Sequence, residues 1–112
     1  MALTVTPVAP ALATTSYATL YTVPAATVGL VKEIVVKNGD SVARQVGINF
    51  VPSGGSASAT NEIRNYASTN TIAAGDTEVW SMDTALAAGD FIQFKSDANS
   101  VVSVRVTVGQ IT

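Results

Sequence analysis

Two aspartates, Asp76 and Asp90, end identical Ala-Ala-Gly-Asp motifs that stand 14 residues apart. Paired carboxylates can divide the acid and base roles of a hydrolysis when their surroundings separate their pKa values. The alternative is a turn used twice, because Gly75 and Gly89 permit a backbone conformation closed to other residues and each aspartate can accept a bond from a nearby backbone N–H. No candidate nucleophile, histidine or substrate-binding arginine stands beside either motif. We therefore favour two turns that each lead into a strand.

The chain of 112 residues contains no histidine and no cysteine. It thus lacks the usual general base, the commonest zinc ligand and any thiolate or disulfide chemistry. Calcium needs about six to eight oxygen ligands, several of them usually from one loop, and no Asp-x-Asp-x-Asp-Gly run is present. We expect no catalytic site, no cofactor and no metal site. The aspartates near predicted turns are interpreted as solvated: Asp40, Asp76, Asp83, Asp90 and Asp97.

Charge and hydropathy argue against two classes of partner. The net charge is −2 and only 12% of residues are charged, so the chain has no electrostatic reason to bind nucleic acid. No apolar run approaches the ~20 residues that span a bilayer, and the first 16 residues lack the basic and apolar regions of a signal peptide. Such low charge on a small domain favours a surface that a protein partner partly covers.

Short runs rich in Val and Thr, each ended by turn residues, predict strands and no helix. The clearest run is 101–111, where the valines at 102, 104, 106 and 108 share one face. Residues 29–52 are predicted to form a hairpin around a tight Asn38-Gly39 turn. The other predicted strands are 3–8, 17–25, 77–82, 90–96 and a short one near 63–66.

About eight short strands predict an all-β fold, an antiparallel β-sandwich that is jelly-roll-like. An immunoglobulin-like sandwich is less favoured because the Cys–Trp–Cys pattern is absent. Residues 17–112 are expected to form one domain. Residues 1–16, with prolines at 7 and 10, are expected to form an edge strand or an extended arm.

Two groups of residues are candidates for binding. The N-terminal segment offers apolar side chains to a neighbouring subunit, and the loop 53–60 is a second candidate. A carbohydrate-binding module would instead need an exposed aromatic platform, for which Trp80 and Tyr66 with Arg64 are candidates, although a large aromatic such as Trp80 is more often buried in a core or a subunit seam. The candidate residues of the N-terminal segment are Leu3, Val5, Val8 and Leu12.

The order of motifs over residues 19–96 resembles small virion proteins of tailed bacteriophages. In those proteins an L-Y-T-V-P-A strand end precedes an I-V-K-x-I-x-V-x-N strand, a V-P-x-G-G-x-A segment and a late A-G-D. The corresponding segments of this chain are Leu20–Ala25, Val31–Asn38, Val51–Ala57 and Ala88–Asp90.

The resemblance implies a non-enzymatic structural component of a phage virion, assembled in the host cytoplasm. Its partners would be the major capsid protein or another virion protein, together with copies of itself, a trimer being favoured. A capsid decoration or cement protein is preferred to a fibre protein because the chain has no fibrous or coiled-coil repeat. The alternative is a host-recognition or carbohydrate-binding module of a tail or fibre.

Overall fold

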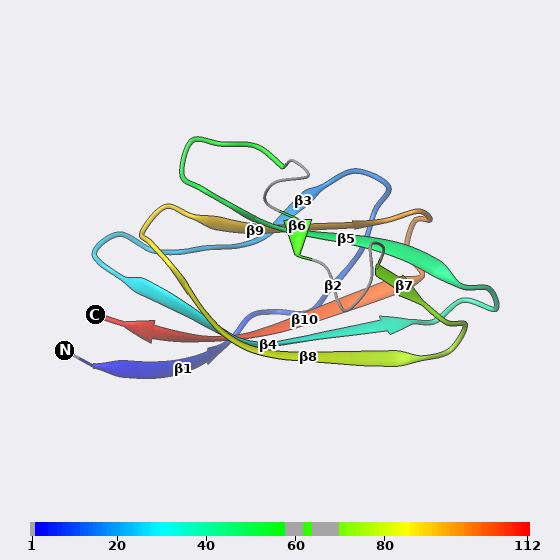
Figure 1. Cartoon of the computed structure of the whole chain (residues 1–112), viewed down its shortest axis with the longest axis horizontal. Helices are drawn as coiled ribbons and strands as arrows, with labels where there is room; N and C mark the ends of the chain where they lie inside the picture. The colour runs from blue at the N-terminus through cyan, green and yellow to red at the C-terminus, as the bar shows by residue number, and fades with distance from the viewer. Residues whose placement is uncertain (1, 58–61, 64–69) are drawn as a thin grey trace.

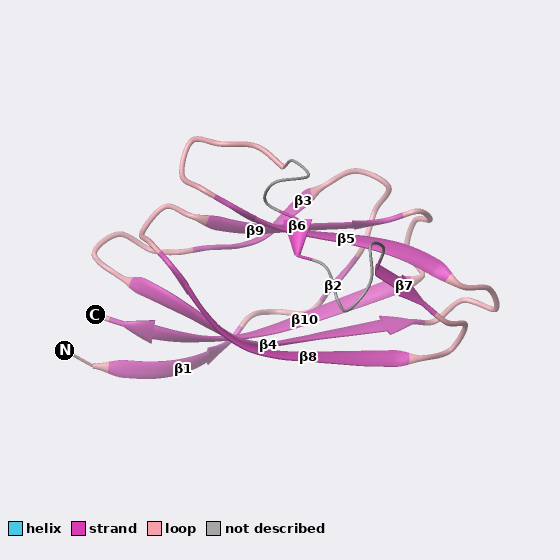
Figure 2. Ribbon diagram, in the orientation of Figure 1, coloured by secondary structure: helices cyan, strands magenta, loops and turns pink. Residues whose placement is uncertain are grey.

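The structure is a computed structural model that describes residues 2–57, 62–63 and 70–112. Strands make up every regular element of the described residues, and Figure 2 shows no helix among them. Accordingly, the described part of the chain has no helix that could cross a membrane. The strands are β1 (Leu3–Pro7), β2 (Ala11–Leu12), β3 (Ala18–Thr22), β4 (Val28–Asn38), β5 (Arg44–Val51), β6 (Glu62–Ile63), β7 (Asn70–Ile72), β8 (Thr77–Leu86), β9 (Phe91–Ser96) and β10 (Val102–Ile111).

The strands form two antiparallel sheets that face each other (Figure 1). Sheet A has the order β1-β10-β4-β8, with β2 also paired to β10. Sheet B has the order β3-β9-β5-β6, with β7 also paired to β5. If β1 with β2 and β6 with β7 are each taken as one interrupted strand, eight strands remain, and the chain crosses between the sheets at nearly every connection. This order is that of a jelly roll and confirms the predicted fold class.

The core lies between the sheets and is built by strand alternation. The four valines of β10 predicted to share a face are all buried, while Arg105 on the other face is exposed. This pattern buries one face of β10 and leaves the other for solvent or a partner. From sheet B, Ile48, Ile92 and Phe94 meet these valines across the core, and Ile34 of β4 is fully buried beside them.

The predicted hairpin over 29–52 is wrong. Strand β4 pairs with β10 and β8 in sheet A, whereas β5 pairs with β9 in sheet B, so the segment between them crosses from one sheet to the other. Gly39 has no positive φ; its N–H donates to the carbonyl of Val101 at 2.8 Å. An Asn-Gly pair makes a tight turn only where both flanking strands share a sheet, and here each has a better partner elsewhere.

Asn38 holds this crossing together from inside the protein. Its side chain is fully buried, and its Nδ2 donates to the carbonyl oxygens of Val42 at 2.8 Å and Ile72 at 3.0 Å. Its Oδ1 accepts from the N–H of Asp40 at 2.9 Å. The amide therefore ties the β4–β5 crossing to the end of β7. A buried polar group of this kind is stabilising only while each of its bonds is made.

We expect Asn38→Ala to lower the free energy of unfolding by about 2 kcal/mol, because buried carbonyl groups lose their donor. Asn38→Asp should cost more, since it places a carboxylate against those carbonyl oxygens. Urea unfolding of both variants measures the two effects. Equal stability of wild type and Asn38→Asp would contradict this role for the amide.

Tyr17 lies over part of the outer face of sheet B. A Cβ added to Gly47 of β5 would lie 2.4 Å from the Tyr17 hydroxyl oxygen, so the phenol occupies the space that a side chain would need. The Lys95 ammonium lies 5.0 Å from the centroid of the Tyr17 ring, within the range of a cation–π interaction. Glycine at position 47 thus allows an aromatic ring to close over the sheet.

Gly47→Ala should therefore destabilise the domain by roughly 1–3 kcal/mol, because the added methyl forces Tyr17 away from its place. The double variant Gly47→Ala/Tyr17→Ala provides the control. In the Tyr17→Ala background the alanine should cost much less, and a double-mutant cycle by chemical denaturation measures the difference. Additive effects of the two substitutions would show that the contact is unimportant.

The N-terminal segment lies along the edge of its own sheet A. The N–H of Ala2 donates to the carbonyl of Thr112 at 3.1 Å, and the N–H of Thr112 returns a bond to Ala2 at 3.0 Å. Farther along, the N–H of Ala13 donates to the carbonyl of Val102 at 2.7 Å. Residues 2–13 thus follow β10 along its whole length, and both chain ends lie at the same end of the sandwich (Figure 1).

Candidate interaction surface

The two Ala-Ala-Gly-Asp motifs lie at opposite ends of β8. Asp76 precedes the first residue of this ten-residue strand and Asp90 follows its last, so they are separated by about 30 Å at ~3.3 Å per residue. Gly75 and Gly89 both have positive φ, at 72° and 89°. The two aspartates therefore do not form a paired carboxylate site, and both motifs are turns.

The Asp90 carboxylate accepts hydrogen bonds from two backbone N–H groups. Its Oδ2 accepts from the N–H of Ala87 at 2.9 Å, and its Oδ1 accepts from the N–H of Ser53 at 3.0 Å. It thereby joins the β8–β9 turn to the segment after β5. Among the described residues, no group of three or more acidic side chains is placed to hold a metal ion.

Asp40 belongs to an ion pair at the opposite end of the sandwich. Its Oδ2 accepts from Nε of Arg44 at 2.8 Å and from Nη2 at 2.6 Å, and its Oδ1 accepts from the N–H of Ser41 at 2.7 Å. The Arg44 guanidinium, followed by the Ser41 N–H, lowers the pKa of Asp40 below its ordinary value. This acid is engaged in fixing the crossing loop after β4.

The Asp40 pKa gives a direct check of that ion pair. In an NMR titration of carboxyl carbons, we expect Asp40 to titrate below its ordinary pKa of 3.8 and Arg44→Met to raise that pKa. Because the pKa of Asp40 is lower in the folded state than in the unfolded state, its ionisation stabilises the folded protein at any pH above the unfolded-state pKa. This stabilisation is lost as the pH falls through the folded-state pKa. The stability difference between wild type and Arg44→Met should therefore shrink in acid, whereas a constant difference would contradict the pair.

The candidate binding residues divide into three groups. Leu3, Val5 and Leu12 are exposed, while Val8 is partly buried against the core. Trp80 is 7% exposed and packs in the core, as the favoured interpretation expected and not as the alternative of an exposed platform requires, because β8 turns this residue inward. Its Nε1 donates to Glu78 at 3.1 Å. The other two candidate residues, Arg64 and Tyr66, lie outside the described residues, as does 58–60 of the candidate loop.

Strand β1 turns its apolar residues away from the core. Thr6 is paired with Val108, which is fully buried, so the threonines of β1 lie on the core side. Leu3 and Val5 alternate with them and are each 63% exposed. A strand at the edge of a free sandwich normally has the reverse pattern, with apolar residues inside and polar residues outside. The register of β1 therefore presents an apolar edge to the surroundings.

This edge continues across sheet A. In one row Leu3 is paired with Ile111 and Ile111 with Val28; in the next, Val5 is paired with Gly109 and Gly109 with Leu30. Gly109 leaves room for Leu3, whose Cδ1 would lie 3.0 Å from a Cβ at that position. We call this surface the apolar stripe and define it by five side chains: Leu3, Val5, Val28, Leu30 and Ile111.

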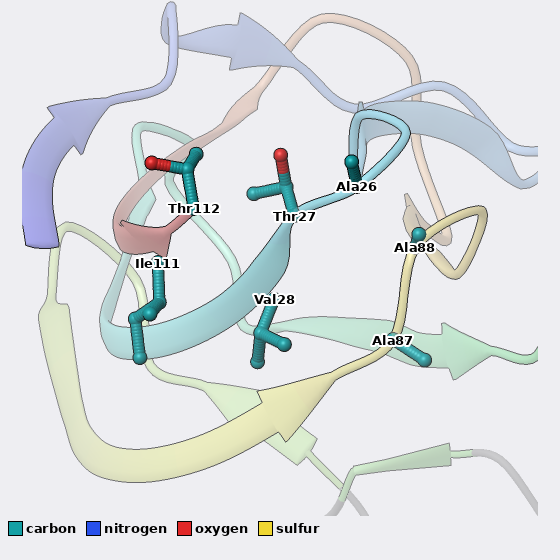
Figure 3. Close-up of a pocket in the computed structure, with 7 residues that line it drawn as sticks. All are labelled: Ala26, Thr27, Val28, Ala87, Ala88, Ile111 and Thr112. Carbon is teal, nitrogen blue, oxygen red and sulfur yellow. The ribbon is translucent and has the colours of Figure 1, made fainter. Parts of the chain in front are cut away.

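The apolar stripe leads into a groove at the end of the sandwich (Figure 3). Its volume is about 580 Å³, and it is lined by Val28 and Ile111, by Ala26 of the β3–β4 turn, and by Ala87 and Ala88 of the β8–β9 turn. The two alanines of the second Ala-Ala-Gly-Asp motif, Ala87 and Ala88, thus form part of the apolar lining of the groove. A groove with such a lining can accept an apolar side chain of a partner.

The sequence indicates one side of this surface and not the other. Leu3 and Val5 are apolar residues of a predicted edge strand or arm, but Val28 and Ile111 stand near strand ends and carry no signal of exposure. Only the pairing of β10 with both β1 and β4 brings them beside Leu3. The signal that could have located the row is Gly109, a glycine within the strongest strand of the chain, where close packing over a backbone is a common reason for glycine.

No protein-family model and no curated protein sequence matches this chain. Solved structures that share its fold include a pilus protein and a protein of a viral particle. One is from Bacillus endospore appendages, which form disulfide-linked pili; it is 14% identical with a TM-score of 0.60, and the match covers 98% of this chain and 88% of that one. The other is from the T13 IBDV viral particle, 9% identical with a TM-score of 0.50, covering 96% of this chain and 30% of that chain. At these identities the likeness concerns the fold alone.

Proposed function

We propose that this chain is a non-enzymatic structural protein of a bacteriophage virion, a capsid decoration or cement protein that stabilises the head shell through protein–protein contacts. The observation that carries the proposal is the apolar stripe. Strand β1 presents the apolar side chains of Leu3 and Val5 to water, which is unfavourable, and contact with a partner surface would bury them. The stripe and the adjoining groove form a surface suited to contact with another protein.

Two comparisons support a structural role. The solved structures that share the fold come from a pilus and from a viral particle, both of which are assemblies of many subunits. The sequence resemblance over residues 19–96 adds the phage virion as the setting, with the major capsid protein or another virion protein as the partner. Many weak contacts repeated over a shell would then add to a large stabilisation.

The composition favours one mode of assembly over another. The fold neighbour from endospore appendages belongs to disulfide-linked pili, whereas these 112 residues contain no cysteine. Subunits of this chain would therefore be held by burial of apolar side chains and by polar contacts, as expected of a cement protein added to a preformed shell.

Purified particles provide the test. We expect the protein to co-purify with intact virions in hundreds of copies per particle, as quantitative mass spectrometry would count, because decoration follows the repeat of the shell. Virions that lack the protein should lose shell integrity at a lower temperature, and added full-length chain should restore it. About a dozen copies or fewer would point to a neck, fibre or tail component instead, and absence from particles would refute a virion role.

A further inference from the structure

The two outer faces of the sandwich differ in what covers them. On sheet B, Tyr17 lies over Gly47, and Val51 is fully buried beside the segment that contains Gly55. On sheet A, the side chains of Val5 and Val79 are both more than half exposed, and they lie on the two opposite edge strands, β1 and β8. Sheet A therefore presents the larger bare apolar surface among the described residues.

The outer face of sheet A is large enough for a stable interface. The width of the face is roughly 20 Å, because its four main strands lie about 4.8 Å apart. Its length is about 33 Å, which is the length of the ten-residue strands β8 and β10. That area of about 650 Å² is close to the ~800 Å² that each partner buries in a standard protein–protein interface. Docking through this face would cover the apolar stripe completely.

The charges on this face suit a second copy of the same chain. Next to the apolar stripe, Lys32 forms an ion pair with Asp83. Glu33 and Lys37 point outward from β4, and Arg105 points outward from β10. Three cations and two anions leave a net charge of +1 on this face. Because acids and bases are interspersed, a second copy can place opposite charges against each other, whereas a single net charge attracts an anionic membrane or nucleic acid only weakly.

The edges of the sheets are less suited to association than the face. The pairing of β8 with β4 shifts register between Val31 and Glu33, and the pairing of β3 with β9 shifts between Thr19 and Tyr21. The N-terminal edge is interrupted between β1 and β2. Irregularities of this kind oppose the addition of a further strand, as in natural sheets that avoid edge-to-edge pairing.

We propose that the outer face of sheet A is an interface between two copies of this chain, which pack apolar stripe against apolar stripe about a two-fold axis. A two-fold interface uses the same patch on both subunits, so one apolar surface supplies both sides. Face-to-face sheets about 10 Å apart would bury Leu3, Val5 and Val28 as in a sandwich core. The inference deepens the proposed function and rests on it, since it names the partner that covers this surface of a structural subunit.

The test is the oligomeric state of the full chain, measured by sedimentation velocity over a concentration series. We expect a dimer for the wild type, and for Val5→Glu a dissociation constant at least ~100-fold weaker, because charge would be buried in an apolar contact. Val42→Glu is the matched control: Val42 is half-exposed but lies in the β4–β5 crossing, away from sheet A. This variant should dimerise as the wild type does.

A second substitution separates burial from the sign of the charge. Val5→Glu and Val5→Lys should both be folded monomers by circular dichroism and sedimentation, because either charge would be buried in an apolar contact. A dimer of unchanged affinity in either variant would overturn the burial of Val5 in the interface. A chain that stays monomeric at about 100 µM, a trimer, or equal loss of association in Val42→Glu and Val5→Glu would overturn the two-fold interface.

The outcome is separable from that of the virion experiment. A chain that dimerises through sheet A but is absent from virions would leave the interface intact and remove the proposed function. Conversely, virions that carry a monomeric form of the chain would keep the function and refute the two-fold interface.

Discussion

The antiparallel pairing of β10 with β4 on one side and with the N-terminal segment on the other is the constraint on which the rest of this structure depends. Because side chains alternate along a strand, the register that buries the valines of β10 also fixes every residue on its outer face. A shift by one residue would expose that valine face and bury Arg105. The core and the apolar stripe are therefore two consequences of a single register.

The same constraint explains why the N-terminal segment has an unusual pattern. With Thr6 paired to the buried Val108, Leu3 and Val5 must point outward. The segment contributes to the sheet mainly through backbone bonds, and its apolar side chains add little to the core of this chain. Its role in folding and its capacity for association are thus physically distinct, since one uses the backbone and the other uses the outer side chains.

Polar interactions hold one end of the sandwich, whereas the other end presents apolar side chains. At one end, the buried amide of Asn38 and the ion pair of Asp40 with Arg44 hold the β4–β5 crossing against β7. At the other, the alanines of the β8–β9 turn line the groove beside Ile111. One end is therefore fixed by internal polar bonds, whereas the other leaves apolar surface for contact. The jelly-roll order places both sets of crossings where neither interrupts the core.

The sequence by itself determined the fold class, most of the strands, the inward face of β10 and the turn role of both Ala-Ala-Gly-Asp motifs, because alternation and positive-φ glycines are local signals. It did not determine which strands pair. The Asn38-Gly39 pair favoured a hairpin, and burial of Trp80 was favoured only by the size of its side chain, because local chemistry does not reveal to which sheet a strand belongs or which face looks inward. Only the tertiary structure sent β4 and β5 to opposite sheets and placed Leu3 beside Ile111 and Val28, since those contacts depend on pairing between residues far apart in the chain.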